Sequence, residues 1–439
     1  MTKDDITYVV FFYSLVVASI IDRFFVIDRH KGHYGAGVGM TALLFLCGSE
    51  ILYPLVNVGI NTIIILCFSR KRWSGILSFI FTSAYLFYFR YYCFASSLTN
   101  MFMMSTTLKM MSVAIDHAKV NEFPKHNDDT EFQLTNEITF EHLIFYALHY
   151  IGLVGVPFYT YKTYSDYINL PFKHHSSDWQ YKSWICVIDS FIVILGRQLL
   201  NYFWPFSYFL TDEFLEKRSI FYRIWIIYPL GFDFVLRIYN AFIMANIPCY
   251  ISGLGAYPDF TKPECGHGPT INIEKMKMLS KENLHDVTFS YKTIENAKIK
   301  KVYFLMQFKK SIKYWNRTIQ FWLYKYVFKM VPYNALKKPA TMLFSSYWHG
   351  LQLSNLLSLF FVSLIIYIEE RWENILKGKK FSSFHKCIRT VLKIHILYNL
   401  ITIFISQEWN VIVRYQSSVY WNYIVILSLL LLSSFFVRP

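Results

Sequence analysis

A histidine and an asparagine stand out because each lies in an apolar surrounding, where a polar side chain is costly to bury. His349 lies in the segment SSYWHG, inside the apolar run 340–368, and Asn316 precedes it by 33 residues in SIKYWNRTIQFWLYK. A neutral imidazole can take a proton from a hydroxyl, and an amide can donate a hydrogen bond to a negatively charged oxygen. Both residues follow a tryptophan, Trp315 and Trp348. The pair is therefore a stronger candidate for chemistry than either member alone.

Each residue also has an ordinary interpretation. A lone histidine on an apolar face is more often a hydrogen-bonded core residue than a catalyst. Asn316, Arg317 and Thr318 form the N-x-T pattern of a glycosylation acceptor, which requires a flexible lumenal site. At helical periodicity the segment 311–332 forms one helix with Asn316 on its apolar, aromatic face. We therefore expect a helix against a bundle or at a membrane interface, and no glycosylation.

The rest of the chain predicts a membrane protein. Hydrophobic residues make up 54% of it and charged residues 17%, whereas soluble proteins carry about 25% charged residues. The apolar residues gather in blocks that approach the ~20 residues needed to cross a bilayer. Clear blocks are 7–21, 51–68, 75–92, 183–210, 220–251, 340–368, 391–405 and 420–437, and weaker ones are 35–47, 98–115 and 143–156. The expected fold is all-α: one polytopic transmembrane bundle of eight to eleven crossings, in a single domain spanning 1–439.

The net charge of +15 would suggest nucleic-acid binding in a soluble chain. Here the basic residues cluster between apolar blocks, at 70–72, 298–313 and 377–393. Such clusters usually set membrane topology and contact anionic lipid, and they could also meet an anionic substrate. We expect no nucleic-acid partner. The seven cysteines are scattered singly without metal-ligand spacing, so neither a metal site nor a disulfide framework is expected.

Two polar stretches interrupt the blocks. The stretch 117–133 has the composition of an exposed loop, and 253–301 begins GLGAYPDFTKPECGHGPT, where glycines and prolines indicate tight, irregular backbone. The motif GLGAYP lacks the preceding strand and following helix of a nucleotide-binding loop. No nucleotide site is therefore expected there.

The segments YWNRTIQFWLYKYVFK and SSYWHG together resemble the signature of the membrane-bound O-acyltransferase superfamily. Further segments, GLVGVPFYTYKTYSDYINLPF at 152–172, the 253–270 stretch and YKTIEN at 291–296, resemble the lysophosphatidylinositol acyltransferase branch. The resemblance extends from the first helix to about residue 370 of the 439. It implies a multi-pass protein of the endoplasmic reticulum membrane, whose helical bundle encloses an intramembrane catalytic chamber.

The resemblance also implies a reaction. Acyl would pass from acyl-CoA, a co-substrate, to the sn-2 hydroxyl of lysophosphatidylinositol, with a polyunsaturated, arachidonoyl-type donor. His349 is expected to be the general base, and Asn316 either a donor to the oxyanion or an orienting residue. Trp315, Trp348, Tyr347 and Ser346 are expected to contact substrate. Neither a bound cofactor nor a metal is required.

One motif departs from the branch. Its members usually continue after His-Gly with Pro-Gly-Tyr-Tyr, whereas this chain has LQLSNLLS at 351–358. Without proline and glycine we expect a helix that is less kinked after Gly350 than in those members, and a reshaped cavity there. Two other functions remain open: acylation of secreted proteins of the Wnt or Hedgehog type, as in another branch, and a transporter or channel with His349 as a proton relay.

Overall fold

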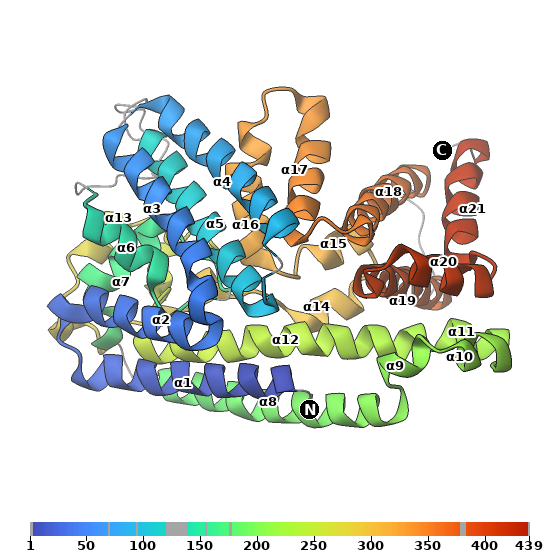
Figure 1. The fold of residues 1–439 in the computed structure, drawn as a ribbon, viewed down its shortest axis with the longest axis horizontal. Helices are drawn as coiled ribbons and strands as arrows, with labels where there is room; N and C mark the ends of the chain where they lie inside the picture. Colours follow the sequence, from blue (N-terminus) through green and yellow to red (C-terminus); the bar gives the residue numbers. More distant parts are fainter. Residues whose placement is uncertain are drawn as a thin grey trace. The chain divides into compact units, whose positions relative to one another are not determined.

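The computed structural model describes residues 3–68, 71–93, 95–119, 138–153, 156–174, 178–377 and 383–437. Within these ranges the chain is helical except for one two-stranded sheet and connecting loops (Figure 1). It divides into two compact units. The first unit comprises 1–190, 242–296 and 317–326, and the second comprises 191–241, 297–316 and 327–439. The all-α prediction is confirmed.

The first unit contains the amino-terminal helices and the irregular glycine-rich stretch. Its helices are α1 (Lys3–Phe25), α2 (Lys31–Cys47), α3 (Leu52–Cys67), α4 (Arg72–Tyr92), α5 (Ser97–Lys119), α6 (Phe140–Leu148), α7 (Tyr161–Asn169), α13 (Ile273–Lys277) and α16 (Arg317–Tyr326). Its short 3₁₀ helices are η1 (Asp28–His30), η2 (Gly48–Ile51), η3 (Pro171–His174), η4 (Asp259–Thr261), η5 (Lys281–Asn283) and η6 (Lys292–Ile294). Strand β1 (Tyr257–Pro258) pairs antiparallel with β2 (Phe289–Ser290). Because α5 extends through Lys119, the predicted loop 117–133 begins later than expected, and its remainder lies outside the described residues.

The second unit contains five short helices that precede Asn316 and the helices that follow Val327. They are α9 (Phe206–Phe209), α10 (Asp212–Lys217), α11 (Ile220–Trp225), α14 (Ile299–Phe304), α15 (Phe308–Ile312), α17 (Asn334–His349), α18 (Leu353–Ile375), α19 (Ser383–Ser406), α20 (Trp409–Ser418) and α21 (Asn422–Phe436), with the 3₁₀ helix η7 (Phe328–Met330). Two long helices, α8 (Asp178–Phe203) and α12 (Ile227–Ser252), contribute residues to both units.

Several helices are long and apolar enough to cross a membrane. In the described ranges these are 28–67, 178–209, 220–252, 353–375 and 383–406, with a sixth if α20 and α21, bent by 75°, count as one span. A polytopic membrane protein is therefore confirmed. The expected eight to eleven crossings exceed this count. One reason for the smaller number is that polar side chains lower the mean hydropathy of two long helices. These are four tyrosines and Arg90 in α4, and Lys109 and Asp116 in α5.

Glycines on one face of α2 allow it to pack closely on the segment 145–150. A Cβ on Gly39 would lie 1.8 Å from the Leu148 carbonyl oxygen, and one on Gly35 would lie 2.3 Å from the His149 ring. The spacing of these glycines resembles the small-residue stripes that bring membrane helices together. Gly37, on another face of the same helix, has no atom within 4 Å of such a Cβ. Close packing therefore explains the glycines at 35 and 39 but not the one at 37.

Two helices expected from the sequence are each broken. The segment 311–332 bends at residues 313–316 before α16 begins, and the apolar run 340–368 is divided between α17 and α18. The first prediction was wrong because hydrophobic periodicity continues across the bend, although Asn316 adopts left-handed backbone. The second was wrong because α17 ends at His349, where Gly350 is fully extended at φ 162° and ψ 171°.

Candidate functional site

Asn316 lies in the bend between α15 and α16, directly before the first residue of α16. Its backbone is left-handed, with φ of 49°. Among non-glycine residues, asparagine and aspartate tolerate this conformation best, because their short polar side chains can hydrogen-bond locally. Asn316 is therefore placed by a turn rather than by a helix face.

The backbone after Asn316 is held by Glu295 and Asn296. The Arg317 N–H donates to the Asn296 carbonyl at 2.8 Å, and the Arg317 guanidinium pairs with the Glu295 carboxylate. The Thr318 hydroxyl donates to Asn296 Oδ1 and accepts the Phe158 N–H at 3.2 Å. Thr318 and Asn296 are buried. Four polar interactions thus fix the two residues that follow Asn316.

The backbone before Asn316 is also tied down. The Lys298 N–H donates to the Tyr314 carbonyl at 2.9 Å. The Trp315 ring is partly buried against an apolar cluster of the second unit that contains Phe209 and Tyr415. The turn is therefore held on both sides of Asn316.

The Asn316 side chain itself has hydrogen-bonding capacity to spare. Its Oδ1 is buried and has no hydrogen-bond partner among the described residues. This oxygen is therefore able to accept a hydrogen bond from a bound group. The buried oxygen also supports the expectation that Asn316 is not a glycosylation acceptor.

His349 is the last residue of α17 and lies in the second unit, as Asn316 does. Its half-buried ring packs against Trp348, with centroids 5.0 Å apart, and perpendicular to Phe404 of α19, with centroids 5.6 Å apart. The following Gly350 N–H donates to the Ser346 carbonyl at 3.1 Å, which closes the helix. The histidine thus lies at a helix end with aromatic rings on two sides.

The four predicted substrate contacts have different surroundings. Ser346 and Trp348 are buried, whereas Tyr347 and Trp315 are partly exposed. The Tyr347 ring lies 6.2 Å from that of Phe344 on the same helix. Three of the four belong to the last turn of α17 and the fourth precedes Asn316. Their contact with substrate remains a prediction.

The break after His349 does not depend on proline. Gln352 is the N-cap position of α18, and the Asn355 amide donates to Gln352 Oε1 at 3.2 Å. A Cβ on Gly350 would lie 2.7 Å from Asn355 Nδ2, so Asn355 packs on the backbone beside His349. Gly350 and the residues after it therefore turn the chain without a proline.

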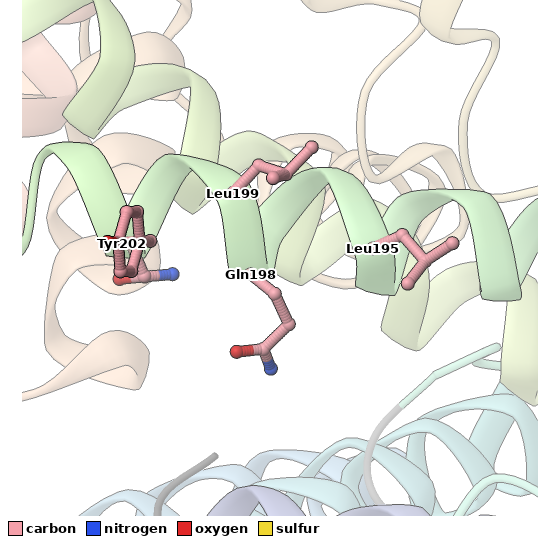
Figure 2. A pocket seen from close by; sticks show the side chains of 5 residues that line it. Leu195, Gln198, Leu199 and Tyr202 are labelled. Atoms are coloured by element: carbon pink, nitrogen blue, oxygen red, sulfur yellow. The ribbon is translucent and has the colours of Figure 1, made fainter.

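A surface hollow on α8 has few side chains that could take part in a reaction. An open hollow of about 620 Å³ is lined by side chains of α8 alone, including Leu195, Gln198, Leu199 and Tyr202 (Figure 2). It carries no ionisable group apart from a tyrosine hydroxyl, and it suits a face turned toward lipid. Among the described residues, no group of three or more His, Cys, Asp or Glu side chains could hold a metal ion.

Sequence reasoning missed the residues that hold the site together. Asn296 and Glu295 stand in YKTIEN, which was noted for its resemblance, but nothing local indicates their contacts with 317–318. Phe404 lies in an apolar helix, where its sequence surroundings do not distinguish it from its neighbours. Contacts between residues so far apart in the chain leave no periodic signal.

Comparison with known proteins identifies the relatives of the chain. No protein-family profile matches it. It is 25% identical to a membrane-bound acylglycerophosphatidylinositol O-acyltransferase of Drosophila melanogaster over 96% of this chain and 90% of that protein. It is 27% identical to the human protein of that description, over 78% and 75% of the two chains, and 27% identical to that of Caenorhabditis elegans, over 76% and 73%. The chain is therefore similar over most of its length to membrane-bound acylglycerophosphatidylinositol O-acyltransferases, and its polytopic helical fold agrees with that similarity.

Proposed function

We propose that the chain transfers an acyl group from acyl-CoA to the free sn-2 hydroxyl of a lysophosphatidylinositol. His349 takes the hydroxyl proton as the oxygen attacks the thioester carbonyl carbon. A carbon–oxygen bond forms, the carbon–sulfur bond breaks, and the CoA thiolate leaves and regains a proton from the imidazolium. General-base assistance of this kind supplies a factor of roughly 10²–10⁴ in rate.

The observation that carries the proposal is the similarity to acylglycerophosphatidylinositol O-acyltransferases over nearly the whole chain. Two features of the chain agree with it. His349 and Asn316 each lie at a break between helices, where a side chain is not committed to helix packing. At the break before α16, the buried Asn316 oxygen has no hydrogen-bond partner among the described residues.

Asn316 has two possible tasks in this reaction. Its amide nitrogen can donate to the oxyanion of the tetrahedral intermediate, where a single donor is worth about 10²–10³ in turnover. Its oxygen can instead accept a hydrogen bond from the imidazole or the attacking hydroxyl, which orients one of them. Both tasks require that the turn hold the side chain in place.

The proposed substrates suit the charge of the chain. Phosphoinositol and CoA phosphates are anionic, and the basic segments 298–313 and 377–393 would attract both. We propose that the donor is a polyunsaturated acyl-CoA and that the protein works in the endoplasmic reticulum membrane. A free thioester is already activated, so no metal enters this step.

An assay of purified protein with arachidonoyl-CoA tests the function. Lysophospholipids that differ only in head group serve as acceptors, and a peptide of the Wnt type serves as the rival acceptor. Transfer to lysophosphatidylinositol, in excess over the choline, ethanolamine and serine lipids, supports the proposal. Equal transfer to all lipids would refute the head-group assignment, and transfer to the peptide alone would refute lipid acylation.

A further inference from the structure

A cavity of about 250 Å³ lies within the second unit among α18, α19 and α21. Apolar side chains form most of its wall, including Ile368 and Trp372 of α18, Ile396 of α19, and Leu427 and Leu430 of α21. α18 and α19 are both candidate membrane spans. The cavity is partly open, so its apolar wall lacks packing contacts on the open side. A hydrocarbon occupant would restore them.

One end of the cavity is charged. Glu369, Arg389 and Lys393 line it. The Glu369 carboxylate accepts the N–H groups of Phe308 and Lys309, both at 2.7 Å. The Lys393 ammonium donates to the carbonyls of Val302, Tyr303 and Leu305. These two charges therefore hold α14 and α15 in place and are not the groups that would bind a head group.

Basic side chains lead from this charged end toward solvent along α19. Lys386, Arg389 and Lys393 occupy positions i, i+3 and i+7, which share one helix face. Lys386 is exposed, Arg389 is partly exposed and Lys393 is buried. The guanidinium of Arg389, which also interacts electrostatically with the Glu369 carboxylate, presents a planar set of five N–H donors that suits a phosphate. Charged side chains on two adjacent spans are typical of the membrane–water interface.

We propose that this cavity binds an anionic phospholipid of the bilayer. Part of one acyl chain fills the cavity, and the phosphate lies against Arg389 and Lys386. The volume agrees with a chain segment and not a whole lipid, since it equals only about eight times the ~30 Å³ share of a liquid water molecule. Basic pockets between membrane helices are a recurring means of binding anionic head groups. The site is separate from the reaction proposed at His349 and does not depend on it.

Trp372 provides a probe inside the cavity, because bromine atoms on an acyl chain quench a tryptophan that they touch. The protein is placed in phosphatidylcholine vesicles that contain either phosphatidylserine or phosphatidylcholine brominated in its acyl chains, at equal mole fraction. The part of the quenching that disappears in Trp372→Phe comes from Trp372 and is the signal of lipid in the cavity. We expect this signal to be larger with brominated phosphatidylserine. Equal signals with the two lipids would overturn the charge selection.

Substitutions at the proposed head-group site separate charge from packing. Lys386→Gln and Arg389→Gln should each lower the preference for phosphatidylserine by about fivefold, the usual contribution of one basic residue at a membrane surface. Arg218→Gln, an exposed arginine of another segment, should leave the preference unchanged. No change in either α19 variant would contradict the proposal.

Substitutions at the cavity wall test the acyl chain. Leu427→Phe fills the cavity and should abolish the Trp372 signal, whereas Leu429→Phe, on an exposed face of the same helix, should preserve it.

Native mass spectrometry provides a second readout that does not depend on Trp372. The amount of phosphatidylserine that remains bound to the protein should fall with Arg389→Gln. If unbrominated lysophosphatidylinositol displaces the brominated lipid better than unbrominated phosphatidylserine does, the cavity is an acceptor-substrate site and the proposal is wrong.

Discussion

The Asn296 side chain accepts a hydrogen bond from the Thr318 hydroxyl at 2.5 Å, although 22 residues separate the two. The same asparagine accepts the Arg317 N–H through its main-chain carbonyl. Two bonds from one buried residue therefore fix the chain immediately after the proposed catalytic asparagine. Asn296 and Thr318 are positioning residues in this account, since they act through the turn at Asn316.

Replacement of Thr318 tests this arrangement. Thr318→Val keeps the shape of the side chain but removes the hydroxyl, which leaves Asn296 Oδ1 and the Phe158 N–H without their partner. We expect kcat to fall by about 10–100-fold, the usual cost of a misplaced catalytic group, with little change in the KM of either substrate. Thr318→Ser keeps the hydroxyl and should retain most of the activity. A serine variant as impaired as the valine variant would contradict a role for this hydrogen bond.

The packing of α2 predicts unequal effects of two identical substitutions. In Gly39→Ala the new methyl group would collide with the Leu148 carbonyl, so the backbone must shift at a cost of about 1–3 kcal/mol. Gly37→Ala meets open space and should be neutral, or stabilise the helix by up to about 1 kcal/mol. Thermal unfolding in detergent measures both. Equal melting temperatures for the two variants would show that the close approach at Gly39 is not needed.

Lys393 should contribute to stability rather than to chemistry. Its ammonium is the shared donor to the carbonyls at the end of α14, so Lys393→Met should cost about 1–3 kcal/mol for each carbonyl left unpaired. Lys386→Met, on the exposed part of the same helix, should change stability in detergent by less than about 0.5 kcal/mol. A Lys393→Met protein that melts like the wild type would show that the carbonyls find other partners.

The stretch after Gly350 should influence the acyl chain more than the head group. Replacing residues 353–356 with Pro-Gly-Tyr-Tyr is compatible with folding, because Leu353 is the first residue of α18, where proline is well tolerated. A tyrosine in place of the buried Asn355 changes the packing beside Gly350 and hence beside His349. Competition between mixed acyl-CoAs and between mixed lysolipids measures both selectivities. A changed head-group preference with an unchanged acyl preference would reverse this assignment.

The helical class and the membrane location could be predicted from the sequence because apolar blocks carry a strong, local signal. The position of Asn316 could not. Hydrophobic periodicity runs through 311–327, and Ile319, Trp322 and Tyr326 are indeed buried on α16 as expected. The bend depends instead on a left-handed asparagine and on the hydrogen bonds that Asn296 accepts from Arg317 and Thr318. Such long-range bonds override local helix propensity and have no period to detect.

The end of α17 was partly visible in advance. Glycine commonly ends a helix, but the apolar residues on both sides of Gly350 led to the prediction of one continuous helix. The absence of the Pro-Gly element suggested a less kinked helix, whereas the chain breaks at Gly350 although that element is absent. Composition therefore identified His349 as unusual, while its place at a helix end and its contact with Phe404 required the structure.

The most direct test of the account is single-turnover acyl transfer by purified His349→Ala protein, with arachidonoyl-CoA and lysophosphatidylinositol. Loss of a general base predicts a fall of about 10²–10⁴-fold in the rate of the chemical step. Expression and melting temperature should stay close to wild type, because the ring is only half-buried. His285→Ala, at an exposed histidine, serves as the matched control and should be fully active. A His349→Ala protein that retains more than about a tenth of the wild-type rate would contradict the assignment of this residue as the base.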